Sequence, residues 1–426
     1  MAAGPLDGIK VLEVTQIVAG PFCGVLLADL GADVVKIEPP GGEGTRVNGA
    51  FMPGESKSYH SLNRGKRSLV VDLQQPDGQA LVHRLVPDFD IFLINMRPTV
   101  PPRLKLDYET LRRLRPDLIY IENTGYGDRG PGAHRSGSDI VAQAFSGLMA
   151  ADAKVDDAGA PLLIGGTAPA DYMAASSAAM GACAALFHRL RTGQGQKVST
   201  SLLLAGMVVQ GGSISKLPVA DVMTVDPTFE RVLAARAAGE SYQRQLEIRG
   251  EAAIVNKAFR LWYGGYRVKD GALILGSLTP ANQDQMRRAL GIEDDPTRSP
   301  DFNALDRAND PIVDAMRDRI RAIMLTKTMD EWIAIFEREG APISKVNFPE
   351  ELADDPQVQA MRYMVELEHE LTGPERMVGP AAYFSESPSG TLRPSPPLGG
   401  HTDEVLREHG LSEAEIADLR ARVVIA

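Results

Sequence analysis

The sequence predicts an α/β protein with a large parallel-sheet domain and a smaller α+β domain. Through the first 200 residues, short apolar strands alternate with helical segments, as in successive β-α-β units. After about residue 215 the pattern changes to a hairpin followed by helices. The chain has 426 residues, of which 44% are hydrophobic, so it is long enough to fold as two or three domains.

A β-α-β unit opens the chain. The apolar run at residues 10–15 predicts a buried strand, Pro21 begins a helix that Gly31 ends, and residues 33–38 form the second strand. Further elements are predicted in the same alternating pattern: strands at 68–72, 91–94 and 118–121, and helices at 77–85 and 108–114. We therefore assign residues 1–200 to one α/β domain.

A long helix is predicted to begin at Asp171 and to end at Gly193. Its first turns carry few side chains larger than Ala or Ser, so another backbone or a ligand can lie close to it. Backbone N–H groups and the helix dipole favour negative charge at this end, which makes Asp171 a candidate nucleophile or ligand-orienting acid. The structural alternative is an N-cap, worth about 0.5–2 kcal/mol.

The second half predicts a linker at 201–225 and a small α+β domain at 226–330. Alternating residues at 262–275 predict a hairpin that turns at Asp270-Gly271. Helices are predicted at 311–325 and 328–339, and a strand is predicted at 340–346, before a Pro/Gly/Ser-rich loop at 385–400.

Composition limits the class of function. The net charge of −11 argues against a general nucleic-acid binder, although a local basic patch for a phosphorylated ligand remains compatible. The seven His residues have no metal-ligand spacing, so no metal site is predicted. The sequence predicts a soluble cytoplasmic protein. It has two cysteines and no disulfide framework, it shows no signal-peptide pattern, and it has no apolar run long enough for a membrane span.

The loop at 15–24 also bears on cofactor binding. It lacks G-x-G-x-x-G, although Glu38 stands where a ribose-binding acid is expected at the end of the second strand. Without the glycines a pyrophosphate cannot approach the helix N-terminus, so a nicotinamide dehydrogenase is disfavoured.

Several motifs carry a more specific signal, and they lie in this order: residues 18–38, 63–68, 95–98, 124–127, 138–147, 171–196 and 397–402. Together they resemble the class III CoA-transferase family, which includes L-carnitine CoA-transferase, formyl-CoA transferase and bile-acid-inducible CoA-transferases. The resemblance covers nearly the whole chain and is weakest at 215–330.

The resemblance implies a Rossmann-like large domain built from both chain ends, with residues 331–426 as the return linker and C-terminal part of that domain. It also implies an interlocked homodimer, with each active site between the large domain of one subunit and the small domain of its partner. The substrates are then a small-molecule acyl-CoA and a carboxylate, without nucleic acid or membrane.

Asp171 matches the catalytic aspartate of the family. The implied reaction forms a mixed anhydride and then an aspartyl-CoA thioester on Asp171, and a second carboxylic acid reverses the sequence. Coenzyme A enters as substrate, and neither a metal nor a permanently bound cofactor is implied.

Eight residues match CoA-contacting positions of the family: Gln16, Ile17, Val18, Ala19, Met96, Arg97, Arg103 and Tyr126. The two arginines suit phosphates, with solvated surface side chains as the alternative. Tyr126 is a core aromatic in the alternative interpretation.

Two other functions remain open: an α-methylacyl-CoA racemase and a non-catalytic acyl-CoA-binding relative. The racemase uses a His–Asp pair, and its histidine falls at Ser138, before Asp139. Serine is no base near neutral pH, and His134 is four residues away, so CoA transfer is favoured over racemisation.

The acceptor acid is expected to be dicarboxylic or otherwise polar, because the small domain offers the basic residues Lys257, Arg260 and Arg267.

Overall fold

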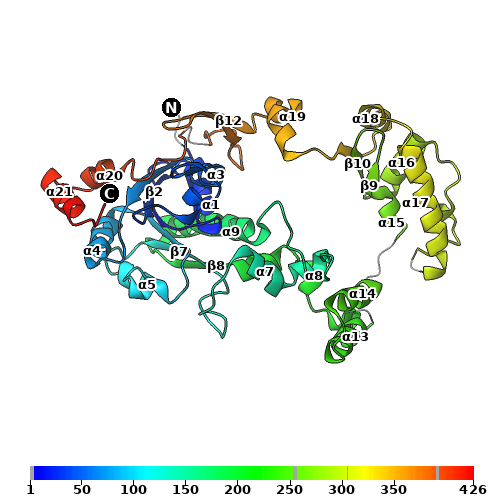
Figure 1. Cartoon of the computed structure of the whole chain (residues 1–426), viewed down its shortest axis with the longest axis horizontal. Coiled ribbons are helices and arrows are strands. Elements are labelled where there is room, and N and C mark those ends of the chain that lie inside the picture. The colour runs from blue at the N-terminus through cyan, green and yellow to red at the C-terminus, as the bar shows by residue number, and fades with distance from the viewer. Residues whose placement is uncertain (1–3, 224, 253–256, 305, 390–392) are drawn as a thin grey trace. The chain divides into compact units, whose positions relative to one another are not determined.

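The structure is a computed structural model that describes residues 4–223, 225–252, 257–304, 306–389 and 393–426. The chain divides into two compact units (Figure 1). The first unit consists of Met1–Pro218 and Pro356–Ala426, so it takes both ends of the chain, and the second consists of Val219–Asp355. Within the described ranges, no helix is both long and apolar enough to cross a bilayer.

A six-stranded parallel sheet forms the centre of the first unit. Its strands are β1 (Lys10–Val14), β2 (Asp33–Glu38), β5 (Lys66–Val70), β6 (Ile91–Ile94), β7 (Ile119–Thr124) and β8 (Lys197–Ser201). The spatial order β5-β2-β1-β6-β7-β8 is doubly wound, with the direction of winding reversed between β1 and β6. The α/β class predicted from the sequence is confirmed.

Helices cover both faces of this sheet, among them α1 (Ala19–Asp29), α4 (Pro76–Leu85), α9 (Pro169–Thr192), α20 (Thr402–Glu408) and α21 (Glu413–Ala421). Successive strand residues point to opposite faces, so Val11 belongs to the core cluster with residues of α1 and α9, while Leu12 belongs to the cluster with residues of α4, α20 and α21. A parallel sheet needs cover on both faces because both are apolar. The C-terminal helices therefore help to build the core of the first unit.

The long predicted helix is α9, and Gly193 ends it in the left-handed conformation with φ 72°. Its buried face is mostly alanine, including the fully buried Ala174, Ala178 and Ala182. These small side chains let α9 lie against α1, β7 and β8. A Cβ on Gly181 would lie 2.7 Å from a methyl carbon of Val198, so the lack of bulk serves close packing on the sheet.

The shorter elements of the first unit connect these layers: α2 (Gly44–Val47), β3 (Ala50–Met52), β4 (Glu55–Ser56), α3 (Lys57–Asn63), η1 (Val86–Asp88), α5 (Val100–Arg103), α6 (Tyr108–Leu111), α7 (Asp139–Ser146), α8 (Leu148–Asp152), α10 (Leu202–Val208), α11 (Gly211–Ile214), α12 (Pro218–Asp221), α19 (Pro356–Ala360), β12 (Met364–His369) and β13 (Gly373–Val378). Helix α12 crosses the boundary to the second unit. Residues 201–225, expected as a linker, contain α10, which packs on α7 and α9.

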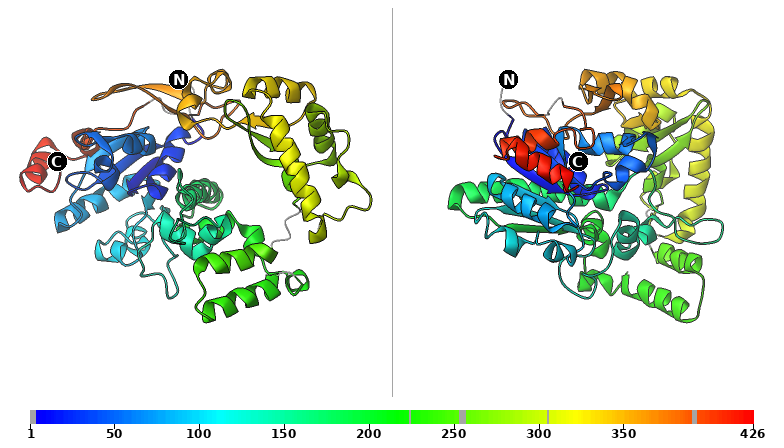
Figure 2. Two further views of the ribbon diagram at one scale, coloured as in Figure 1. Left: turned by 45° about the vertical axis from the view of Figure 1, so that its right-hand side comes forward. Right: turned by 60° about the vertical axis from the view of Figure 1, so that its left-hand side comes forward.

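The second unit contains a small antiparallel sheet in the order β11-β10-β9. Its elements, green to yellow in Figure 2, are α13 (Val225–Ala237), α14 (Tyr242–Ala252), α15 (Phe259–Trp262), β9 (Tyr263–Arg267), β10 (Ala272–Gly276), α16 (Pro280–Leu290), η2 (Pro296–Arg298), η3 (Arg307–Asn309), α17 (Asp310–Met324), α18 (Met329–Arg338), β11 (Ile343–Lys345) and η4 (Pro349–Asp354). The hairpin β9–β10 turns at Asp270-Gly271 as predicted. Because β11 pairs with β10, this unit continues beyond the expected boundary at residue 330.

Candidate active site

Asp171 lies in the first turn of α9. Since α9 connects β7 to the parallel strand β8, it begins at the carboxyl edge of the sheet, where doubly wound proteins bind ligands. Pro169 is the first helical residue and Ala168 is the N-cap, so the N-cap interpretation of Asp171 is wrong. The side chain is 8% exposed, which is unusual for an acid unless a function or a partner requires it.

The N-terminus of α9 is capped by a residue from another helix. One carboxylate oxygen of Asp139 accepts hydrogen bonds from the backbone N–H groups of Ala170, at 2.8 Å, and Asp171, at 3.1 Å. Its other oxygen accepts from the Gln143 amide at 2.5 Å. Asp139 is the first residue of α7, so a contact between residues far apart in sequence fixes the start of α9.

Burial and the neighbouring Asp139 change the pKa of Asp171. Burial, followed by the nearby negative charge of Asp139, raises the pKa of Asp171 to about 7. A carboxylate with this pKa is ionised for about half of the molecules at neutral pH and is more basic than an exposed aspartate. Such a group is suited to act as a nucleophile or a base.

An open cavity of about 430 Å³ lies beside the N-terminus of α9. Ala168 and Tyr172, which flank Asp171 on the chain, line it together with Val18 from the loop after β1. Tyr172 also packs edge-to-face on Phe22 of α1, with ring centroids 4.8 Å apart. The start of α9 and the predicted CoA loop therefore share one cavity.

The predicted CoA loop, Gln16–Ala19, joins β1 to α1 at the point where the winding of the sheet reverses. Asn95, which follows β6, holds it at two points. The Asn95 side-chain oxygen accepts from the Gln16 N–H at 3.0 Å, and the Asn95 amide donates to the Gln16 carbonyl at 2.8 Å. The topology thus brings two of the predicted segments together at the usual ligand-binding crevice.

The other predicted CoA residues lie in the loops that follow β6 and β7. Met96 and Gln16 line one small cavity of about 150 Å³. Arg97 is exposed and donates to the Ser136 hydroxyl at 3.4 Å, and Arg103 is exposed at the end of α5. Tyr126 is half-buried and packs edge-to-face on Phe145 of α7, with centroids 5.2 Å apart.

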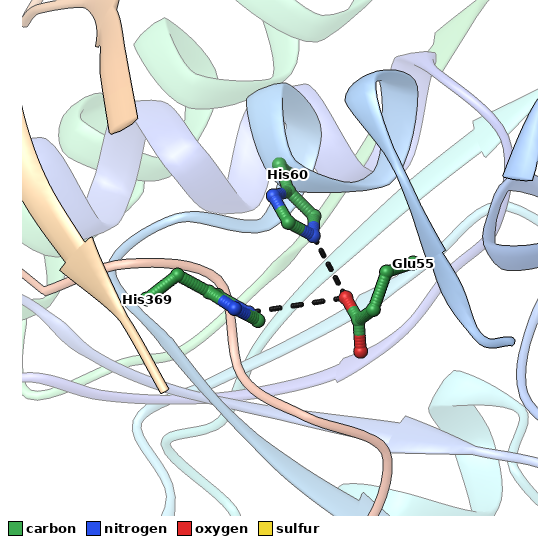
Figure 3. Close-up of side chains that lie close together, drawn as sticks. All are labelled: Glu55, His60 and His369. Carbon is green, nitrogen blue, oxygen red and sulfur yellow. Dashed lines mark hydrogen bonds and ion pairs between the residues drawn. The ribbon is translucent and has the colours of Figure 1, made fainter. Parts of the chain in front are cut away.

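Glu55, His60 and His369 form a buried group whose ligand atoms lie within 4.8 Å of one another (Figure 3). The sequence predicts no metal site, and His spacing gives no signal here because His369 is distant in the chain. The hydrogen bonds test whether this group suits a metal. His369 Nδ1 accepts from the backbone N–H groups of Leu371 and Thr372, both at 3.2 Å. The neutral ring therefore carries its proton on Nε2, the atom that faces Glu55, and that nitrogen has no lone pair for a metal.

His60 has acids on both sides. Its Nε2 lies 2.7 Å from Glu55, and its Nδ1 lies 2.5 Å from Glu375 of β13. Burial and the neighbouring His60 lower the pKa of His369. These contacts form a buried hydrogen-bonded network that joins α3 to the β12–β13 hairpin, and they do not fit a metal centre.

The residues weighed for the racemase alternative are also visible. Ser138 is exposed and precedes α7, and His134 is exposed in the preceding loop. Of the cations considered for an acceptor, Lys257 pairs with Asp310 at 2.6 Å, whereas Arg260 and Arg267 are exposed on the second unit.

The chain is similar to known proteins along nearly its whole length. Residues 6–402 match the family model described as CoA-transferase family III. The chain is 35% identical to succinate–glutarate CoA-transferase of Agrobacterium fabrum, covering 95% of both chains. It is 31% identical to succinyl-CoA–D-citramalate CoA-transferase of Chloroflexus aurantiacus, covering 99% of this chain and 98% of that one. A crystal structure of a CAIB/BAIF family protein from Brucella suis matches with a TM-score of 0.74 and 28% identity, covering 96% of this chain and 100% of that one.

Proposed function

The chain belongs to CoA-transferase family III and is a CoA-transferase acting between an acyl-CoA and a carboxylate, and we propose that Asp171 carries the transferred groups. The observation that supports this most is a buried carboxylate with a pKa near 7 at the start of α9, beside a cavity that the loop after β1 also lines. Burial there favours covalent chemistry because water hydrolyses an anhydride.

The proposed reaction begins when the Asp171 carboxylate attacks the carbonyl carbon of the acyl-CoA. The C–S bond breaks, CoA leaves as a thiolate, and a mixed anhydride forms on Asp171. The thiolate then attacks the Asp171 carbonyl carbon, which releases the acyl group as a carboxylate and leaves an aspartyl-CoA thioester.

The acceptor acid runs these steps in reverse. Its carboxylate attacks the aspartyl thioester, the thiolate leaves, and the thiolate returns to the acceptor carbonyl of the new anhydride. Asp171 is regenerated as a carboxylate, and each bond that forms replaces one that breaks. Negative charge develops at each carbonyl oxygen, and its stabilisation needs hydrogen-bond donors in a site that excludes water.

We propose that CoA binds at the carboxyl edge of the sheet, on the loop Gln16–Ala19 and on Met96, Arg97, Arg103 and Tyr126. The position of the first loop at the reversal of winding supports this assignment. Arginine side chains in this region suit the CoA phosphates because the guanidinium group donates two parallel hydrogen bonds.

For the acceptor we propose a dicarboxylic acid. Both relatives named above act on such acids: succinate, glutarate and D-citramalate. Arg260 and Arg267 are exposed cations of the second unit that suit a second carboxylate.

We further propose an interlocked homodimer, as the family resemblance implies. The exposed apolar side chains Met180, Phe187 and Leu190 on α9 favour a protein partner.

Solvent isotope exchange separates transfer from racemisation. A racemase must remove the α-proton of its substrate, whereas a transferase acts only at the carbonyl carbon. We expect no enzyme-dependent deuterium at the α-carbon of a 2-methylacyl-CoA in heavy water, together with CoA transfer to added dicarboxylates. Mass spectrometry of the CoA esters reads both. Rapid α-deuteration without CoA transfer to any acid would assign proton transfer to Asp139 and Asp171 instead.

The pKa of Asp171 gives a second test, on the pH profile of kcat/KM for acyl-CoA. Activity is expected to fall as pH is lowered through about 7, because protonation removes the nucleophile. Asp139→Asn removes the negative charge that helps to raise this pKa, while the amide oxygen still accepts from the α9 N–H groups. The acidic limb of the profile should therefore move to lower pH in this variant.

Ser138→Ala is the matched control for Asp139→Asn. The Ser138 side chain is exposed and forms no capping hydrogen bond to α7, so its removal leaves the charge next to Asp171 unchanged. An acidic limb at the same pH in Asp139→Asn and the parent enzyme would contradict the coupling between the two acids.

A further inference from the structure

The loop between β1 and α1 contains a residue in an unfavourable backbone conformation. Ile17 has φ 70°, in the left-handed region that a β-branched side chain rarely adopts. Its side chain is 44% exposed, so burial of the side chain does not account for this shape. A conformation of this kind persists where the surroundings fix it, and such positions gather at ligand sites.

One buried carboxylate holds Ile17 directly. Glu43, the N-cap of α2, is 3% exposed, and its Oε2 accepts the Ile17 N–H at 3.0 Å. The other oxygen, Oε1, accepts from the Thr45 hydroxyl at 2.8 Å. The carboxylate therefore cannot turn away from the loop without losing hydrogen bonds in a buried place.

A buried lysine fixes the carboxylate in turn. Lys36 of β2 is fully buried, and its Nζ lies 3.5 Å from Glu43 and 3.2 Å from Glu13 of β1. The same Nζ donates to the Thr15 carbonyl at 3.0 Å, two residues before Ile17. Burial alone lowers the pKa of Lys36, but the surrounding glutamates hold it above its ordinary value, so the ammonium stays charged.

We propose that Glu43, supported by Lys36, is a positioning residue that holds the loop after β1 in the shape that receives CoA. This rests on the CoA site proposed above. Glu43 does not touch the reacting atoms. It acts through the backbone of Ile17, and so sets where the next residue, Val18, meets the cavity beside α9.

The experiment measures CoA affinity by calorimetry, along with kcat and KM for both substrates. Glu43→Ala is expected to weaken CoA binding and to raise KM for acyl-CoA by about tenfold or more, the worth of one hydrogen bond to a charged group. KM for the acceptor acid should change much less. Glu43→Gln keeps an acceptor for the Ile17 N–H, so it should recover part of the affinity, and it remains informative if Glu43→Ala does not fold.

The matched control is Asp90→Asn, at the amino edge of the same sheet. Asp90 is a largely buried carboxylate that accepts from the Lys10 N–H at 2.9 Å and pairs with Arg115 and Arg189. Its replacement should lower stability without changing CoA affinity. A purely structural Glu43 would behave in the same way, lowering the amount of folded enzyme while CoA affinity and KM stay at their parent values.

Two outcomes separate this inference from the proposed function. If Glu43→Ala and Glu43→Gln both bind CoA as tightly as the parent enzyme, the positioning role is wrong even where transfer proceeds through Asp171. If Asp171→Asn retains transfer activity, the nucleophile assignment fails. The calorimetric comparison of the Glu43 variants still decides the role of the loop, because it does not depend on turnover.

Discussion

Replacement of Asp171 by Asn is expected to reduce CoA transfer by several orders of magnitude while leaving the protein folded. The amide has the shape of the carboxylate, but it cannot form the anhydride, so both half-reactions stop. CoA transfer to a dicarboxylate, followed by mass spectrometry, measures the loss. Transfer at the parent rate in Asp171→Asn would remove Asp171 from the mechanism.

The same variant is expected to be more stable than the parent, and increasingly so at higher pH. The pKa of Asp171 is about 7 in the folded chain and near the ordinary value of 3.8 when unfolded. The folded state therefore holds the proton more tightly, and its stability falls as pH rises between these values. Each pH unit in this interval is worth about 1.4 kcal/mol.

Thermal melting at pH 5 and pH 8 checks this expectation. A neutral Asn removes the cost of the buried charge, so the gain in melting temperature should be larger at pH 8 than at pH 5. Equal gains at the two pH values would show that burial of the Asp171 charge is not the cause. A more stable and inactive variant is the pattern expected when a functional residue is held in an unfavourable environment.

Replacement of Arg46 by Met is expected to cost about 3–5 kcal/mol of unfolding free energy, as for other buried ion pairs that lose one partner. Arg46 is fully buried. Its guanidinium donates to both oxygens of Glu38, at 2.7 and 2.8 Å, and to the Pro396 carbonyl at 2.9 Å. It also lies over the Tyr59 ring, 3.6 Å from the centroid. Loss of the guanidinium leaves the buried Glu38 carboxylate without its ion-pair partner.

Denaturation by urea measures this loss, and Arg84→Ala provides the control. Arg84 pairs with Glu415 on the surface, where both side chains are nearly half exposed, so its removal should cost less than about 1 kcal/mol. Similar effects of Arg46→Met and Arg84→Ala would contradict the assigned importance of the buried pair.

The pairing of Glu38 with Arg46 also explains why Glu38 is not available to bind a ribose. Both oxygens of this carboxylate at the end of β2 accept hydrogen bonds from Arg46 in the core.

Local patterns predicted much of the first unit. Strands β2 and β6 have the predicted bounds: β6 is a continuous apolar run, and β2 carries the β-branched residues Val34, Val35 and Ile37, which the sheet buries. The predicted end of the long helix at Gly193 is confirmed, because the left-handed conformation at a helix end favours glycine. The hairpin at Asp270-Gly271 likewise follows from turn chemistry that two adjacent residues carry.

Elements with weaker local signals were missed. The strand β8, Lys197–Ser201, lies at the edge of the sheet and is mostly polar, so no apolar run identifies it. The hairpin β12–β13 contains several glutamates and an alternating pattern of low contrast. Its two strands pair with each other in a separate sheet.

The features of the candidate site likewise fall into those that the sequence predicted and those that only the fold shows. Motifs in the sequence predict Asp171 and the loop Gln16–Ala19 as site residues, and this assignment stays a prediction. The capping of α9 by Asp139 was not predicted, because the two elements are about thirty residues apart and only the fold brings them together. The strained Ile17 and its contact with Glu43 carry no sequence signal either, since a left-handed isoleucine is the opposite of what its side chain favours.

The central claim, that Asp171 carries the transferred groups, is tested most directly by trapping. The enzyme is incubated with acyl-CoA without acceptor, quenched with hydroxylamine and digested, and the peptides are examined by mass spectrometry. Hydroxylamine attacks an activated carbonyl carbon, so a hydroxamate on Asp171 is expected, dependent on acyl-CoA and absent in Asp171→Asn. A hydroxamate on another carboxylate such as Asp139, or active transfer with Asp171 unmodified, would contradict the account.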